Sequence, residues 1–562
     1  MLVGGCEQRM EETMSLSEIA FLFEPDGYVL EGPRLMGRQA AGNGFMRALV
    51  DHAGDRRLRA YSPHKTSGQK FIEIAKSLDP KCKTGWLPAH RLDKLAQVGS
   101  LYLPGPGLDA AAYARLRVGA DAYSLIGVTH TTASHGAMDS ICSLLNAPVF
   151  PWDAVVCTST AVQETIHPLL EAQTDYLRWR LGARDFSVPQ FPLIPLGVHC
   201  DDLDFSASDK MAARRDFAIA DDEIVALFVG RLSFHAKAHP HAMYTALEQT
   251  AQRTGKKIVL LQCGWFANDA IERAFKDGAA QFCPSVRAVW ADGRVADTSR
   301  KAWAAGDVFV SLSDNIQETF GLTPIEAMAA GLPTVVSDWN GYTDTVRDGF
   351  DGFRIPTWMP AAPLGQKHAL RHEVGMDNYD EYCGVTCQSV SVDHNALIDA
   401  LIRLIEDPSL RAEMGLRGKL RARQEFDWPV IIEKYFALWE ELAEIRKAHS
   451  GATVGSAPRV APGRRDPFDV FAGYPTTRID RNTHVVDTKL DRDWQQARAH
   501  WLFSYSGADL PDEDIVARLM GALANEAAKT IEALSRETDI ALETAISALA
   551  WLAKIGCVRF EA

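Results

Sequence analysis

The stretch Glu318–Gly331 reads ETFGLTPIEAMAAG and carries two glutamates eight positions apart, with a glycine and a proline between them. The run before it, DVFVSLS (Asp307–Ser313), is rich in β-branched and aromatic residues, which predicts a buried strand. The run PIEAMAAG holds good helix formers and ends in a glycine, which predicts a helix. The segment is therefore expected to pass from a strand through a turn into the N-terminus of a helix.

The two glutamates have different explanations. Thr323–Glu326 fits a capping box with Pro324 at the first helical position, so Glu326 has a purely structural explanation as a helix cap. Glu318 precedes the turn, near the carboxyl end of the strand, where open α/β sheets bind ligands. A helix N-terminus at that edge offers N–H groups and partial positive charge to a phosphate. Carboxylates beside it suit the hydroxyl groups of a sugar or ribose.

Composition narrows the class of protein. At 562 residues the chain is long enough for two to four domains, and its net charge of −14 argues against a nucleic-acid partner.

The ten cysteines are irregularly spaced, and the pair Cys383 and Cys387 has no second pair at zinc spacing, so neither a disulfide framework nor a metal is expected. Residues 1–16 are expected to be disordered and lack a secretory apolar segment. With no run of about 20 apolar residues, no membrane span is expected, and the cysteines are expected to be reduced in a cytoplasmic protein.

Strand and helix patterns alternate in two successive regions, residues 17–205 and 206–448. Each region is expected to form a Rossmann-like domain around a parallel sheet. The expected strands are Ile19–Glu24, Ala122–His130, Asp153–Ser159, Glu223–Leu232, Lys257–Gly264, Val286–Asp292, Asp307–Ser313 and Pro333–Asp338, and Leu193–Val198 closes the first region. Gly37–Val50 predicts a glycine-rich turn that leads into a helix, whereas residues 357–389 lack periodicity and predict a long inserted loop.

The end of the chain is expected to be a separate module. A linker rich in Gly, Ala, Pro and Arg covers residues 449–470, and residues 471–562 predict a small, mainly helical domain. Its last part, Thr530–Ala562, has a winged-helix-like order of helix, turn, helix and short strand. Nine acidic and five basic residues from Pro511 onward are the wrong balance for DNA. A role in protein docking or self-association is therefore expected.

Several segments, taken together, resemble the retaining glycosyltransferases of family 4, which have the GT-B fold. ETFGLTPIEAMAAGLPTVVSD resembles their E-x7-E segment, and FVGRLSFHAK resembles their G-R-L…K element. LIPLGV and FDWPVIIEKYFALWEEL match further landmarks in the same order. The resemblance covers about residues 17–448 and implies two Rossmann-like domains that face a cleft.

The resemblance implies roles for residues of the second region. Glu326 would bind the ribose hydroxyls of a nucleotide-sugar, and Glu318 would lie by hydroxyls of the donor sugar. Arg231 and Lys237 would neutralise the departing diphosphate, although either cation has a plain alternative as a surface residue. Backbone N–H groups facing the diphosphate and sugar would come from Phe320, Gly321, Leu322 and Thr323.

In the first region, the resemblance places His130 near the donor sugar, with His135 as its competitor. Gly42 and Gly44 would let the backbone approach the donor, since glycine lacks a Cβ atom; an ordinary tight turn is the alternative. A strand-end histidine is otherwise often a structural hydrogen-bonding residue. All three residues therefore have a structural explanation beside the functional one.

The sequence also departs from the family pattern. The gap from Arg231 to Lys237 is six residues, where family members usually have five, and the nearby His235 and His239 are further candidates for phosphate contact. Asp344 stands where the family carries a glutamate. The longer gap puts the position of the Lys237 ammonium group in doubt.

The function expected from this resemblance is that of a retaining hexosyltransferase. It would move a sugar from a nucleotide-sugar to a hydroxyl acceptor without a metal or other cofactor. A sugar-nucleotide epimerase or phosphorylase on the same fold is one alternative, and a non-catalytic nucleotide-sugar-binding regulator that docks through residues 471–562 is another. Membrane contact through the basic clusters Asp55–Arg59 and Tyr176–Arg184 is possible, but a solvated helix face is favoured.

Overall fold

The chain divides into two compact units, residues 1–461 and 462–562, which we describe separately. The computed structural model describes residues 17–29, 37–449, 457–490, 493–505, 510–524 and 528–561. The expected disordered tail, residues 1–16, and part of the expected linker, residues 450–456, lie outside the described residues.

The first half of the larger unit contains a six-stranded parallel sheet in the order β3-β2-β1-β4-β5-β6. Its strands are β1 (Glu18–Leu22), β2 (Arg57–Ser62), β3 (Lys83–Pro88), β4 (Ser100–Tyr102), β5 (Ser124–Val128) and β6 (Ala154–Val156). Its helices are α1 (Pro25–Tyr28), α2 (Gly37–Asp51), α3 (Lys65–Leu78), α4 (Leu92–Val98), α5 (Asp109–Arg115), α6 (His135–Ser143), α7 (Thr160–Leu181) and the short 3₁₀ turn Cys200–Leu203. All five residues of β5 are buried, which explains its continuous apolar run.

The second half repeats this plan with a parallel sheet in the order β12-β11-β10-β7-β8-β9. Its strands are β7 (Ile224–Val229), β8 (Ile258–Gly264), β9 (Arg287–Asp292), β10 (Val308–Ser311), β11 (Thr334–Ser337) and β12 (Gly352–Ile355). Its helices are α8 (Ala207–Asp216), α9 (His241–Thr254), α10 (Asp269–Phe282), α11 (Ala296–Ala305), α12 (Leu322–Ala329), α13 (Tyr342–Thr345), α16 (His394–Glu406) and α17 (Pro408–Arg421).

In both sheets the strand order reverses in the middle, between β1 and β4 and between β7 and β10. This is the Rossmann order, and ligands of such sheets bind outside the carboxyl ends of the strands at the reversal. The expected α/β architecture of two Rossmann-like domains, the GT-B fold, is confirmed. Because Arg231 follows β7 and Glu318 follows β10, the fold places both at that point of the second sheet.

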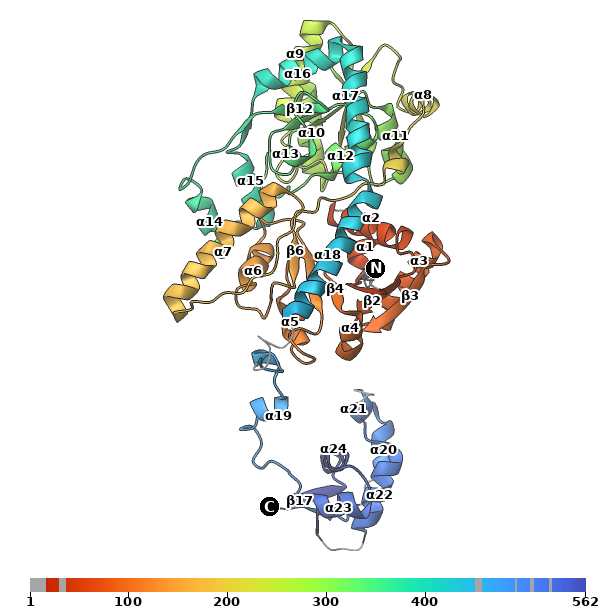
Figure 1. Ribbon diagram of the computed structural model, residues 1–562, viewed down its shortest axis with the longest axis vertical. Coiled ribbons are helices and arrows are strands. Elements are labelled where there is room, and N and C mark those ends of the chain that lie inside the picture. Colours follow the sequence, from red (N-terminus) through yellow and green to blue (C-terminus); the bar gives the residue numbers. More distant parts are fainter. Residues whose placement is uncertain are drawn as a thin grey trace, which may run out of the picture. The chain divides into compact units, whose positions relative to one another are not determined.

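The long helix α18 (Trp428–His449) follows a π-helical turn at Ala422–Phe426 and returns from the second half to the first, as Figure 1 shows. Its buried face lies in the core of the first half, where Tyr435 packs edge-on against Phe45 at 5.1 Å. Its position in the sequence groups this helix with residues 206–448, but its packing joins it to the first sheet.

The segment predicted as an inserted loop, residues 357–389, is instead largely ordered into secondary structure. It contains α14 (Gln366–Glu373) and α15 (Tyr379–Cys387). Both ends meet in a two-stranded antiparallel pair, β13 (Thr357–Trp358) with β14 (Ser391–Val392). The expectation of a loop was wrong because the two helices are short and their apolar pattern is weak.

The two basic clusters lie in different kinds of element. Asp55–Arg59 leads into strand β2 rather than lying on a helix face, and Arg59 pairs with Glu18 at 2.7 Å. Tyr176–Arg184 covers the end of α7, where the Trp179 side chain is exposed. Across the described residues, no helix has both the length and the apolar character needed to cross a membrane.

The smaller unit has a core of its own around Val485, Leu519, Leu534 and Leu549. Its antiparallel sheet runs β16-β15-β17, from β15 (His484–Asp487), β16 (Lys529–Thr530) and β17 (Val558–Glu561). The helices are α19 (Pro467–Val470), α20 (Trp494–Ala499), α21 (Trp501–Ser504), α22 (Glu513–Leu523), α23 (Ile531–Glu537) and α24 (Leu542–Lys554), with a 3₁₀ turn at Pro462–Arg464. The winged-helix likeness and the docking role remain predictions.

Candidate active site

The turn between β10 and α12 is built around a glycine. Gly321 is the N-cap of α12, and its φ of 82° lies in the left-handed region that favours glycine. A Cβ atom at this position would collide with the ring of Tyr342, so the missing side chain also allows close packing. Leu322 and Thr323 begin the helix, where backbone N–H groups lack partners within the helix. The turn therefore presents donors at the edge of the sheet, and Phe320 beside it is buried.

The capping box expected at Thr323–Glu326 does not form. The helix begins at Leu322, so Glu326 is its fifth residue rather than its third, and Pro324 is not in the first helical position. No hydrogen bond or ion pair joins the Glu326 side chain to any described residue. Burial raises the pKa of its carboxyl to about 7. The structural explanation of Glu326 as a cap is therefore removed.

Glu318 and Lys237 form an ion pair, with Lys237 Nζ donating to Glu318 Oε2 at 2.9 Å. The Glu318 side chain is 13% exposed. Burial alone would raise the pKa of this carboxyl, but the charge and hydrogen bond of Lys237, together with backbone hydrogen bonds, hold the pKa below its usual value. The backbone N–H groups of Thr319 and Phe320 act in the same direction. Glu318 is thus held as a carboxylate.

Arg231 lies beside this pair. Its guanidinium NH2 group donates to Gln317 Oε1 at 3.4 Å, next to Glu318 in the chain. The six-residue spacing from Arg231 does not displace Lys237 from the turn, because the loop between them folds back through hydrogen bonds from Lys237 N and Ala238 N to Ser233 O. The structure therefore pairs Lys237 with Glu318 at the reversal point of the second sheet and bonds Arg231 to the neighbouring Gln317.

Asn315 is a residue of this site that sequence reasoning missed. It is fully buried, and its Nδ2 donates to the backbone oxygen of Lys237. Its Oδ1 accepts from the backbone N–H groups of Gln317 at 3.0 Å and Glu318 at 3.3 Å. One side chain therefore fixes the backbone on both sides of the Lys237–Glu318 pair. An amide side chain two positions after the predicted strand Asp307–Ser313 is the sequence signal that points to such a role.

The first half meets the same turn. Thr319 Oγ1 donates to the backbone oxygen of His130 at 2.9 Å, and Ser159 Oγ donates to the backbone oxygen of Thr319 at 2.5 Å. His130 lies just beyond the end of β5, and Ser159 just beyond the end of β6. The carboxyl edge of the first sheet is thus bonded to the residue next to Glu318. Asp344 also crosses the halves, because its Oδ2 accepts from Thr160 N at 2.6 Å.

Gly42 and Gly44 do not lie in a turn. Both are inside helix α2, so the expected glycine-rich turn over Gly37–Val50 is corrected to a continuous helix. A Cβ atom on Gly42 would collide with the backbone oxygen of Gly27, and one on Gly44 would lie 2.9 Å from Trp428 Nε1. The missing side chains therefore allow α2 to pack closely on α1 and α18. A contact of these glycines with the donor stays a prediction.

The remaining histidine candidates, His235, His239 and His135, each contact a nearby residue. The pKa of His235 is lowered by burial, and its Nε2 lies 4.0 Å from Asp380. The backbone N–H of His239 donates to Asp314 Oδ1 at 3.3 Å, and burial raises the pKa of Asp314 to about 7. His135 stacks on His372 at 3.7 Å.

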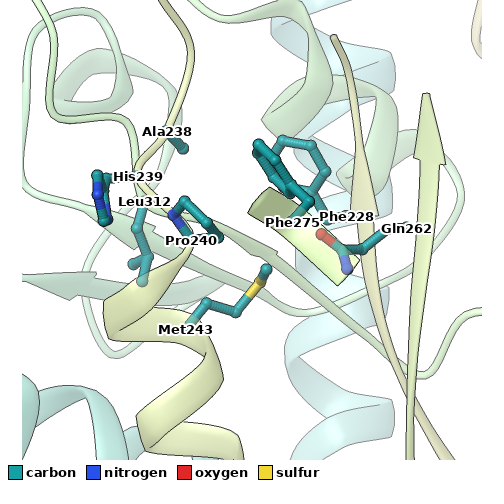
Figure 2. Close-up of a pocket in the computed structure, with 8 residues that line it drawn as sticks. All are labelled: Phe228, Ala238, His239, Pro240, Met243, Gln262, Phe275 and Leu312. Carbon is teal, nitrogen blue, oxygen red and sulfur yellow. The ribbon is translucent and has the colours of Figure 1, made fainter. Parts of the chain in front are cut away.

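A small pocket lies beside the loop that carries Lys237. It is lined by Phe228, Ala238, His239, Pro240, Met243, Gln262, Phe275 and Leu312, as Figure 2 shows. This lining is mostly apolar. It includes none of the candidate catalytic residues Arg231, Lys237, Glu318 and His130. The pocket therefore reflects how the loop packs onto the sheet rather than where polar chemistry takes place.

The fold and this site define a GT-B protein with a cationic turn at the reversal point of its second sheet. Residues 209–362 match the family described as "Glycosyl transferases group 1", so the second half contains a domain of that family.

Three known proteins illustrate the similarity. An uncharacterized glycosyltransferase of Methanocaldococcus jannaschii is 28% identical over 154 residues, which are 27% of this chain and 37% of that protein. A D-inositol 3-phosphate glycosyltransferase of Geodermatophilus obscurus is 31% identical over 242 residues, which are 41% of this chain and 50% of that protein. The crystal structure of Anabaena HepE in complex with UDP-glucose has a TM-score of 0.46 at 15% identity, covering 77% of this chain and 99% of that chain. The chain thus spans half or less of the length of these curated relatives.

Proposed function

We propose that this protein is a retaining glycosyltransferase that moves a sugar from a nucleotide-sugar donor to a hydroxyl acceptor. The observation that carries the proposal is the Lys237–Glu318 pair, joined at 2.9 Å beside Arg231 and the N-terminus of α12. Cations and helix N–H groups suit a diphosphate, and partly buried carboxylates suit sugar hydroxyls. The match to a glycosyltransferase family over residues 209–362 supports the same activity.

In the proposed reaction, the bond between the anomeric carbon and the diphosphate oxygen breaks while a bond to the acceptor oxygen forms on the same face. The departing diphosphate gains negative charge, which Arg231, Lys237 and the N–H groups of the turn stabilise. The acceptor proton passes to the departing phosphate oxygen. Glu318 and Glu326 hold donor hydroxyls, and His130 approaches from the opposite half. This assignment needs no separate protein base and no metal.

Donor binding is tested first. A panel of nucleoside diphosphates and their sugars, including UDP-glucose and GDP-mannose, is scanned by thermal shift. A ligand at about 100 times its dissociation constant adds about 2.7 kcal/mol of stability. Glu326→Ala should reduce the shift. A panel in which no nucleotide shifts the wild-type protein would refute the proposal.

Turnover is tested next, with the donor that binds. Release of nucleoside diphosphate is measured with and without acceptors and with and without EDTA, and NMR of the product gives the anomeric configuration. We expect acceptor-dependent release, no effect of EDTA, and the donor's configuration in the product. An inverted product would contradict retention. Binding without turnover would favour a regulatory protein, and an altered donor sugar without transfer would favour an epimerase.

A role for the smaller unit can be separated from catalysis. We propose that residues 462–562 dock a protein partner or a second copy of the chain, since this unit has a core of its own. A chain ending at residue 461 should keep transfer activity and lose association in light scattering or co-purification. Lost activity together with unchanged association would contradict this division.

A further inference from the structure

The segment between Thr357 and Val392 is an element built onto the second half. Its two ends pair as a short antiparallel stalk, Thr357 with Val392 and Trp358 with Ser391. Between them, helices α14 and α15 are joined by a turn that Arg371 clamps by donating to both carboxylate oxygens of Asp377, at 2.8 and 2.5 Å. Such internal bonding gives this segment, which we call the α14–α15 element, a defined shape.

The α14–α15 element rests on the loop that separates Arg231 from Lys237. Cys387 Sγ donates to the backbone oxygen of Phe234 at 3.5 Å, and the Asp380 carboxylate lies 4.0 Å from His235 Nε2. The packing is close, because a Cβ atom on Gly384 would lie 3.2 Å from His235. Helix α15 therefore covers the cation-bearing loop of the candidate site.

The same element also reaches the first half. The Tyr379 hydroxyl lies 3.3 Å from Thr131 Oγ1, and Thr131 directly follows His130. The ring of His372 is sandwiched between His135, at 3.7 Å, and Tyr382, at 4.4 Å. The α14–α15 element thus bridges the two loops that carry His130 and Lys237, and it stands as a further wall beside the site.

We propose that this wall forms the acceptor subsite, in which Tyr379 and Thr131 bind a hydroxyl-rich acceptor such as a sugar or polyol. This inference rests on the function proposed above. The hydroxyls of Tyr379 and Thr131 each donate and accept, and both residues are partly exposed at the His130 side of the site. The exposed carboxylate of Asp380 adds a further acceptor for substrate hydroxyl groups. Two neighbouring hydroxyls and a carboxylate match a ligand that offers several hydroxyl groups.

The test uses the full chain and three substitutions. Tyr379→Phe removes one hydroxyl and keeps the ring, and Asp380→Asn removes one charge at constant size. Tyr382→Phe is the matched control, because it alters a tyrosine of the same helix whose ring can still stack on His372. Nucleoside diphosphate release is measured with glucose, N-acetylglucosamine, glycerol and myo-inositol 3-phosphate as probes, and with water alone.

We expect at least one of these polyols to stimulate release by the wild-type protein. Tyr379→Phe should raise the KM of that acceptor about fivefold, the effect of losing one neutral hydrogen bond, and Asp380→Asn should raise it as well. The donor KM and the release in water alone should change less than twofold. Tyr382→Phe should match the wild type in every measurement.

Three results would overturn the inference. The first is stimulation by none of the polyols while donor hydrolysis in water persists. The second is an unchanged acceptor KM in both Tyr379→Phe and Asp380→Asn. The third is a rise of donor KM equal to that of acceptor KM, which would assign the wall to the donor. Absence of both donor binding and hydrolysis in the wild type would instead refute the proposed function itself.

Discussion

Lys237 Nζ lies 2.9 Å from Glu318 Oε2, although the two residues follow different strands and are separated by 81 positions in the sequence. The contact joins the loop after β7 to the loop after β10, at the point where the strand order of the second sheet reverses. It keeps a cation and a carboxylate together where a diphosphate and a sugar would meet.

Replacing Lys237 by methionine keeps much of its apolar stem and removes the charge. We expect the rate of sugar transfer to fall at least about 100-fold, because the leaving group loses one fixed cation. Lys301→Met is the control, since Lys301 pairs with Asp216 and Asp297 at the surface. Rates of nucleoside diphosphate release should be unchanged in this control. Equal rates in Lys237→Met and the wild type would exclude a role in catalysis.

The raised pKa of Glu326 makes stability depend on pH. Its carboxyl binds a proton more tightly in the folded chain, with a pKa of about 7 against an ordinary value of 4.5. The resulting stabilisation is complete below pH 4.5 and is lost as the pH rises through about 7. Glu326→Gln stays neutral throughout. It should therefore gain stability relative to the wild type between pH 5 and pH 8, by on the order of 2 kcal/mol.

Thermal unfolding at pH 5 and pH 8 measures this difference. Burial also raises the pKa of Asp314 to about 7, but Asp314 is present in both proteins and its effect cancels in the comparison. The same difference in Tm at the two pH values would contradict the raised pKa of Glu326.

Asn315 tests whether catalysis depends on the alignment of Lys237 and Glu318. Asn315→Ala removes the bonds to Lys237, Gln317 and Glu318, and kcat/KM should fall about 100-fold because the reacting groups lose their alignment. Asn315→Asp keeps the oxygen that accepts from Gln317 and Glu318, but it replaces the donor to Lys237 by a second oxygen that repels the Lys237 carbonyl. Its kcat/KM should lie between those of the wild type and Asn315→Ala. An unchanged kcat/KM in Asn315→Ala would contradict the positioning role of Asn315.

Gly321 combines a left-handed backbone with a close neighbour. Gly321→Ala should destabilise the protein by about 1–2 kcal/mol from backbone strain, with a further cost from collision with Tyr342. Gly349 has a φ of 70° but has no atom within 4 Å of an added Cβ, so Gly349→Ala isolates the strain. The fall in Tm should be clearly larger for Gly321→Ala. Equal falls would show that the Tyr342 ring moves aside at no cost.

The first half is stabilised by a fully buried ion pair between Arg115 and Asp153, with oxygen–nitrogen distances of 2.6 and 2.8 Å. Asp153→Asn leaves the guanidinium without its counter-charge and should cost about 3–5 kcal/mol. Asp93→Asn breaks the exposed pair with Arg91 and should cost far less stability, because solvent screens that pair. Tm values of the two variants provide the comparison. A small loss in Asp153→Asn would mean that water reaches Arg115.

The second half was largely predictable from the sequence, and the first half less so. The strands β7 to β11 lie within their predicted runs because most of their residues are buried and apolar. Strand β2 was missed because RLRAYS alternates charged and apolar residues. Strand β4 was missed although its three residues, SLY, are all buried. Local composition predicts a strand best where the strand is apolar and buried on both faces.

At the site, the sequence pointed to Lys237 and Glu318 but not to the residues that connect them. The roles of Asn315 and Thr319 depend on hydrogen bonds between distant segments, and residue type alone gives no measure of those. The capping box predicted at Thr323–Glu326 does not form, because the left-handed backbone of Gly321 starts the helix at Leu322. Helix α15 did carry a sequence signal, a capping box between Asn378 and Glu381, but it lies in a segment that otherwise lacks periodicity.

The return of α18 to the first half has a consequence for biosynthesis. The core around Phe45 and Tyr102 is completed by Trp428 and Tyr435, which the ribosome makes long after the strands they cover. We expect the nascent first half to stay incompletely folded, with an uncovered apolar strip, until α18 has emerged. A chain stopped before Trp428 should bind chaperones or precipitate, and adding α18 as a separate peptide should rescue its solubility.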